Sequence, residues 1–275
     1  MSGMSGRIDT AWRAPYTLYL RQIPEGPLIQ MVPAHTAPQN RTVHTGQQTK
    51  PPQPWGKAAA AALLVVLALI MLQAIGLGVS GLFAELAQLE MERSGLPTGP
   101  PGARDVGHIE QRLYSSLRYA SGNPWTLEQM GALNLAKMRA STVPREAVAL
   151  TRDARARFRQ ALVQRPTSPF LWANLALAKL YLDEIDAEFF AALTYADVLG
   201  PWEPIVQQVT VFVGLAAWQA LDPGMRQALL RTLERAAIRN AEKMVQIVKS
   251  YRRIDLLCGN SKYNSIVGHE CAKSR

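Results

Sequence analysis

An uncharged apolar run from Ala58 to Ala84 constrains the fold more than any other part of the chain. The run contains no Asp, Glu, Lys or Arg. A bilayer core is about 30 Å thick, and a helix crosses it with about 20 apolar residues. The run is too long, and begins too far from Met1, to be the apolar part of a signal peptide. It predicts an uncleaved membrane-spanning helix over 58–84 that continues to about residue 93; the alternative is a buried helix of a soluble core.

Charges beside this run predict its orientation. Lys50 and Lys57 precede it, whereas Glu85 and Glu90 follow it with Arg93 as a nearby basic residue. Because Lys and Arg are enriched on the cytoplasmic side of membrane helices, the N-terminus is expected in the cytoplasm. The C-terminal part is then expected outside it.

Composition narrows the class of partner. The chain has 275 residues and a net charge of +9, with 30 basic and 21 acidic residues spread over both sides of the run. Nucleic-acid-binding proteins concentrate basic residues on one element, so no nucleic-acid partner is expected. The sequence also lacks the motifs of nucleotide-binding, hydrolase and zinc enzymes. We therefore expect no catalytic residues, no cofactor and no metal site.

Proline and glycine spacing divides the rest of the chain. Residues 1–57 are predicted to form a disordered, Pro-rich, basic cytoplasmic tail, and residues 94–107 a Gly/Pro linker between membrane and domain. Helical periodicity then predicts an all-α domain over 108–255, with its last helix unbroken to about Tyr251. Thr126 with Gln129 predicts a capping box at one helix start. Residues 256–275 are expected to be a loose tail.

The middle of this domain resembles the tetratricopeptide repeat. The residues that match the repeat at its intervals are Ala154, Phe158, Ala161, Pro166, Trp172, Leu175 and Ala176. Lys179 departs from the pattern, because it stands where the repeat usually has Tyr. The resemblance implies stacked antiparallel helix pairs that bind other proteins.

The single anchor, the Pro-rich tail and the stretch ADVLGPWEPIVQQ are similar to VpsP-type repeat proteins of bacterial exopolysaccharide gene clusters. This resemblance implies a scaffold or regulator of polysaccharide biosynthesis or export, in the bacterial inner membrane with a periplasmic domain. An assembly factor for secretion or cytochrome maturation is an alternative. An envelope enzyme that acts on glycans through carboxylates within 183–188 is another.

Two cysteines near the C-terminus, Cys258 and Cys271, predict a disulfide in an oxidising compartment. Two free thiols, or a metal site that includes His269, are the alternatives.

Candidate partner-binding residues fall into two groups. A basic group could contact another envelope protein, an anionic polymer or lipid headgroups, and the alternative is a solvated helix face. Two tryptophans could stack on sugars, and the alternative for them is core packing. Self-association of the short domain is also open. The candidates are Arg231, Arg235, Arg239, Lys243, Trp172 and Trp202.

Overall fold

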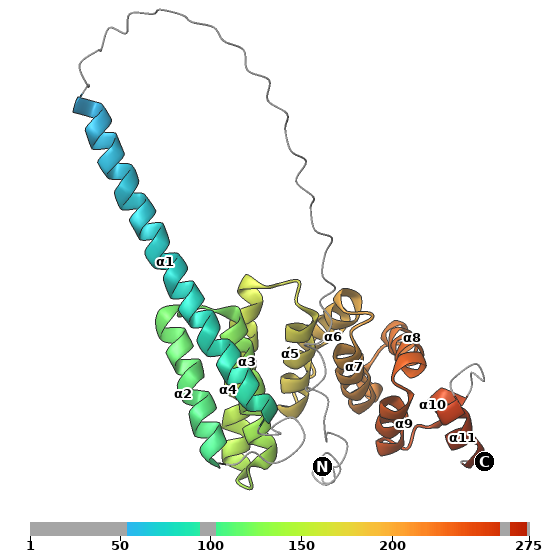
Figure 1. The fold of residues 1–275 in the computed structure, drawn as a ribbon. Helices are drawn as coiled ribbons and strands as arrows, with labels where there is room; N and C mark the ends of the chain where they lie inside the picture. The colour runs from blue at the N-terminus through green and yellow to red at the C-terminus, as the bar shows by residue number, and fades with distance from the viewer. Residues whose placement is uncertain (1–53, 94–102, 259–264, 274–275) are drawn as a thin grey trace, which may run out of the picture. The chain divides into compact units, whose positions relative to one another are not determined.

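The computed structural model describes residues 54–93, 103–258 and 265–273, and these residues form helices and turns without a strand (Figure 1). The all-α prediction is confirmed. The expected N-terminal tail lies almost entirely outside the described residues. The helices are α1 (Pro54–Arg93), α2 (Ala103–Tyr119), α3 (Pro124–Ala140), α4 (Pro144–Gln164), α5 (Pro169–Tyr181), α6 (Ala187–Leu199), α7 (Pro204–Ala216), the 3₁₀ turn η1 (Trp218–Ala220), α8 (Pro223–Arg239), α9 (Ala241–Ser250), α10 (Asp255–Cys258) and α11 (Ser265–Lys273).

Proline sets the starts of α3, α4, α5, α7 and α8. Its fixed φ suits the first helical turn, where its missing N–H is not needed. Side chains then cap free backbone amides: Ser168 accepts from Leu171 N, and Asp222 accepts from Met225 N. For α3 the cap is Asn123, which accepts from Trp125 N, so the predicted capping box at Thr126 is wrong.

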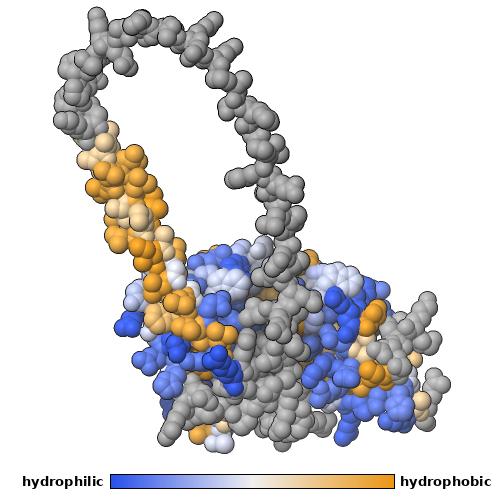
Figure 2. All heavy atoms as spheres, in the orientation of Figure 1, coloured by the Kyte–Doolittle hydropathy of each residue, from blue (hydrophilic) through white to orange (hydrophobic). Residues whose placement is uncertain are grey.

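The chain divides into two compact units, and the boundary falls inside α1 between Ile75 and Gly76. Before that boundary every described side chain from Ala58 to Ile75 is exposed. Figure 2 shows this part of α1 as an apolar rod. Over the described residues, α1 is the one helix long and apolar enough to cross a membrane. Its mean hydropathy is 2.6, and none of its most apolar stretch is buried. This finding is consistent with a single-pass membrane protein.

The second half of α1 belongs to the helical domain. Ala87 is fully buried in a small core with Ile109 and Leu113 of α2, to which α3 adds Met130 and Leu133. The domain therefore includes α1 from Gly76 onward and does not begin at residue 108. Helix α2 also begins at Ala103, inside the segment expected as linker. The segment between α1 and α2 therefore connects two helices of the domain, because the end of α1 already belongs to the domain.

Buried hydroxyls fix α1 against α2 and α3. Ser80 Oγ and Ser116 Oγ lie 2.8 Å apart, and Ser116 Oγ lies 2.6 Å from Thr126 Oγ1. Asn123 Nδ2 donates to Ser80 Oγ at 2.8 Å. Ser80, Ser116 and Thr126 are all fully buried, so these hydrogen bonds hold α1, α2 and α3 in one register.

The remaining helices share one larger core. Neighbours α3 and α4, α5 and α6, and α7 and α8 form antiparallel pairs, and α5 also contacts α7. Phe158 of α4 and Phe189 of α6 are fully buried within this core. Close packing depends on small residues, since a Cβ on Gly131 would meet the Phe158 ring at 2.5 Å.

The C-terminal region differs from expectation in two ways. The last helix breaks at Asn240 into α8 and α9, although its apolar stripe predicts one helix. The expected loose tail contains α10 and α11, whose Leu257 and Val267 are buried in the main core. Both differences follow from tertiary packing, which local periodicity does not encode.

Candidate binding surfaces of the helical domain

The predicted basic group lies on α8 and α9. Arg231 and Arg239 are exposed, and Lys243 is half-buried. Within the described residues, none of these three side chains forms an ion pair with a carboxylate. Three cations are therefore available to a partner on neighbouring parts of two helices.

Arg235 has a different role from its neighbours. Its Nη2 lies 2.6 Å from Asp197 Oδ1 of α6 and donates to Thr232 Oγ1 at 3.0 Å. Thr232 Oγ1 also donates to Asp197. Arg235 therefore joins α8 to α6, and the structure does not place it with the available cations.

The two candidate tryptophans differ in their packing and exposure. Trp172 packs against the main core, its Nε1 donates to Pro166 O at 2.7 Å, and its ring lies 4.9 Å from that of Tyr195. Core packing therefore describes Trp172. Trp202, between α6 and α7, is 58% exposed and stays available for binding.

Sequence reasoning missed an ionic cluster around Lys179, whose side chain is fully buried. Its Nζ lies 3.2 Å from Glu184, 2.9 Å from Asp186 and 2.8 Å from Glu188. Two arginines of α4 complete the cluster, because Arg155 pairs with Glu184 and Arg159 with Glu188. The sequence signal was available: three acids follow one lysine by five to nine positions.

This cluster holds its carboxylates ionised. The pKa of Glu188 is lowered, chiefly by the hydrogen bond from Arg159, and that of Asp186 is lowered, chiefly by the hydrogen bond from Lys179. The pKa of Glu184 is also lowered, because hydrogen bonds from Arg155 and Lys179 outweigh desolvation. Desolvation works against the charge on Lys179, but its three carboxylate partners outweigh that effect and raise its pKa. A general acid needs a raised carboxyl pKa, so this geometry suits a structural cluster better than catalysis.

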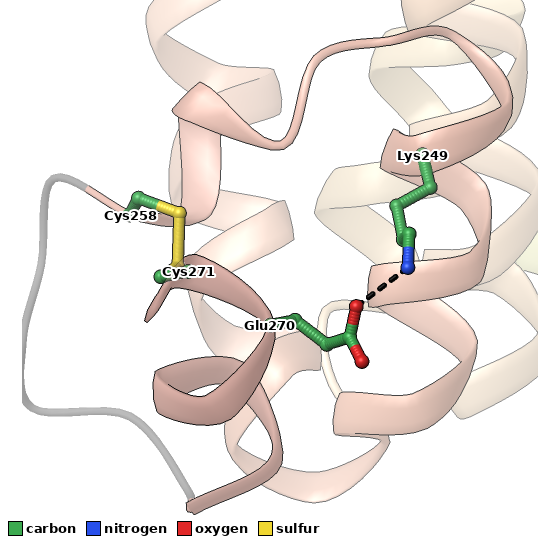
Figure 3. The surroundings of a disulfide bond; sticks show 4 residues. All are labelled: Lys249, Cys258, Glu270 and Cys271. Carbon is green, nitrogen blue, oxygen red and sulfur yellow. Dashed lines mark hydrogen bonds and ion pairs between the residues drawn. A yellow bond between two sulfur atoms is a disulfide. The ribbon is translucent and has the colours of Figure 1, made fainter. Parts of the chain in front are cut away.

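The C-terminal cysteines form a disulfide, Cys258–Cys271, with their Cα atoms 5.5 Å apart (Figure 3). The predicted bond is confirmed. It joins α10 to α11, and Lys249 of α9 pairs with Glu270 of α11 at 2.5 Å. Among the described residues, no group of three or more His, Cys, Asp or Glu is placed to hold a metal ion.

The arrangement thus offers exposed Arg231 and Arg239 on α8, a half-buried Lys243 on α9 and an exposed Trp202, and the Arg235–Asp197 pair joins α8 to α6. In comparisons with known proteins, no family model, no curated protein and no solved structure matched this chain.

Proposed function

We propose that this chain is a membrane-anchored scaffold whose helical domain binds another envelope protein through the basic face of α8 and α9. The observation that carries the proposal is the exposure of Arg231 and Arg239 without carboxylate partners among the described residues. Their neighbour Arg235 is held by Asp197, so α8 is fixed against α6 and presents its free cations on a stiff support. An acidic protein surface fits this face, and an anionic polymer is the second chemistry that would.

Anchoring and orientation belong to the same proposal. The apolar half of α1 spans the inner membrane of a bacterium, with the N-terminus in the cytoplasm and the helical domain in the periplasm. Lys50 and Lys57 before the run support this orientation. The Cys258–Cys271 bond supports it independently, because disulfides persist in oxidising compartments. Anchoring raises the effective concentration of the domain towards membrane partners.

The process we propose is polysaccharide biosynthesis or export, on the resemblance to VpsP-type proteins. The protein would organise or regulate the machinery without catalysing polymerisation. Assembly of a secretion or cytochrome-maturation system is the second candidate.

Deletion in the native host, followed by measurement of the yield and chain length of secreted polysaccharide, tests the process. We expect loss of polymer or a shifted length with otherwise normal growth. Complementation with the double variant Arg231→Glu, Arg239→Glu tests the surface, and Arg152→Glu on exposed α4 is the matched control. The wild type and the control should restore polymer, whereas the double variant should not.

Crosslinking tests the proposed binding surface independently of the proposed role in polysaccharide biosynthesis or export. A photoreactive residue at position 231 in native membranes should give a defined crosslinked protein, and one at position 152 should not. If the partner is captured but the polymer is unchanged after deletion, the scaffold proposal stands and the polysaccharide proposal falls. Equal crosslinking at both positions would refute the proposed surface.

A further inference from the structure

Large apolar side chains gather at one end of the helical domain. Val163 of α4 is 84% exposed, and Val198 of α6 and Ile238 of α8 are each 65% exposed. These three residues occupy the same place in alternate helices, near the C-terminus of each. We call this the apolar end; its members are Tyr119, Trp125, Val163, Val198, Trp202 and Ile238.

Contacts within the domain show that these residues share one end. Gln164, at the end of α4, donates to Gly122 O in the turn that precedes α3. The Arg165 guanidinium lies 3.5 Å from the centre of the Trp125 ring. Gly200, after α6, lies against Pro169 at the start of α5. The helix ends therefore alternate: α2, α4 and α6 finish where α3, α5 and α7 begin. The Arg235–Asp197 pair places the last turns of α8 beside the end of α6.

Exposed charges of both signs occur at both ends of the domain, with Arg145 and Glu146 at the start of α4 and Arg239 and Glu242 around the end of α8. The opposite end carries exposed acids in its helix starts and turns, namely Glu146, Asp183, Asp186 and Asp222. Near the apolar end, Glu128 pairs with Arg165 at 2.9 Å, and Asp197 pairs with Arg235. Arg239 is exposed beside Ile238. The apolar end therefore combines exposed apolar groups with Arg239, which forms no ion pair with a carboxylate among the residues that the structure describes.

The packed half of α1 enters the domain at this same end. A Cβ on Gly76 would lie 3.4 Å from Tyr119 O, and Asn123 donates to Ser80 Oγ. The rings of Phe83 and Tyr119 are stacked with their centres 5.9 Å apart. Gly76 is the first residue of α1 in the unit that contains the domain, so α1 enters the domain at the apolar end.

We propose that the apolar end of the domain rests on the membrane surface, in contact with the headgroups and upper acyl chains of an anionic bilayer. Tyr and Trp are enriched at this depth because one part of each ring system is apolar and another is polar. Aliphatic side chains beside them gain by leaving water, and arginine attracts anionic lipid. The inference rests on the proposed anchoring, and adds a second, peripheral contact between the domain and its membrane.

The test uses full-length protein in liposomes of phosphatidylethanolamine and phosphatidylglycerol. Single cysteines replace Val163, Val198 and Ile238 at the apolar end, and Val143 and Val148 toward the opposite end as exposed matched controls. The native cysteines are bonded to each other and do not react with a nitroxide label without reductant. Electron paramagnetic resonance then compares collisions of each label with oxygen, which favours lipid, and with a water-soluble nickel complex.

We expect labels at positions 163, 198 and 238 to favour oxygen over nickel at least several-fold more than labels at 143 and 148. Equal nickel access at both ends would overturn the inference. A label in place of Leu67, within the apolar stretch, separates this failure from failure of the anchor. If position 67 is in lipid but both ends are in water, only the membrane contact is wrong; if position 67 is also in water, the anchoring fails as well.

Discussion

At position 179, ionic contacts of a lysine take the place of the apolar packing expected there. The sequence resemblance to the tetratricopeptide repeat implies Tyr at this position, whereas here the lysine stem fills a fully buried site. Its amine reaches three carboxylates on the turn and helix that follow. Truncating one partner of such a cluster is costly, because the remaining charges lose their compensation.

We predict that Lys179→Met lowers the free energy of unfolding by about 2 kcal/mol near neutral pH, a value below that of a fully buried pair because the carboxylates are partly exposed. The pKa values of Glu184, Asp186 and Glu188 are lowered on folding, so their contribution is present above pH 4.5 and is lost as pH falls through their folded values. The raised pKa of Lys179 extends its contribution up to and beyond pH 10.5.

Thermal unfolding of the full-length protein in detergent checks this prediction across pH. The difference in melting temperature between wild type and Lys179→Met should be greatest between about pH 5 and pH 10 and should shrink towards pH 3. Arg152→Met, on the exposed side of α4, serves as the control. A difference that stays constant with pH would contradict the ionic role.

Position 131 requires a residue without a side chain, and Gly131 meets this requirement. An added Cβ would lie 2.5–2.9 Å from three atoms of the Phe158 ring, and that ring is fully buried. We predict that Gly131→Ala destabilises the domain by about 1–3 kcal/mol through overpacking. Gly107→Ala in α2 is the matched control, because nothing lies within 4 Å of its Cβ position. Helix propensity alone should make that control neutral or more stable by up to about 1 kcal/mol, and chemical denaturation of both variants measures the contrast.

Among the elements, those with strong local signals could be predicted from the sequence. Proline positions and apolar periodicity predict helices over 144–164, 169–182 and 186–198, close to the observed α4, α5 and α6. The break at Asn240 could not be predicted, because the apolar stripe continues across it and packing decides the turn. The cap of α3 was misplaced because Thr126 has a suitable side chain, but that hydroxyl bonds to Ser116. Of the candidate site, Arg231 and Arg239 are exposed as expected, whereas the partner of Arg235 lies 38 residues away in sequence.

The disulfide joins α10 and α11, which also attach to the domain through buried Leu257 and Val267. The bridged cysteines are 13 positions apart, and closing a loop of this size contributes about 3 kcal/mol in the chain-entropy model. We predict that Cys258→Ser frees α11 from α10 and lowers the melting temperature by several degrees. Lys249 and Glu270 still connect α11 to α9 in that variant.

Alkylation in native membranes gives an independent readout of this bond. Wild-type protein should take up a thiol reagent only after reduction, whereas Cys258→Ser should be modified at Cys271 without it. Free alkylation of the unreduced wild type would exclude both the bond and the oxidising compartment argued from it.

At the scale of the whole molecule, the single apolar run of the sequence divides into two parts in the structure, one exposed and one packed in the domain. The part before Gly76 is exposed throughout, and the part after it contributes Ala84 and Ala87 to a buried core. Hydropathy alone could not separate them, since a lipid-facing helix and a packed helix are equally apolar. The packed half of α1 is received by Ile109 and Leu113 of α2, which lie more than 30 residues after Gly76 in the sequence and share a core with Ala87.

Under the proposed anchoring, the hydrogen bonds of Ser80 limit how much of α1 can enter a bilayer. Since Ser80 is committed to Ser116 and Asn123, the stretch free to match a bilayer runs from Ala58 to Val79. Its 22 or so residues give a helix about 33 Å long, close to the hydrocarbon thickness of an ordinary membrane. A thicker or thinner bilayer would impose a hydrophobic mismatch costing fractions of a kcal/mol per ångström. Under the proposed anchoring, the buried pair Ser80 and Ser116 would thereby set the bilayer thickness that suits this helix.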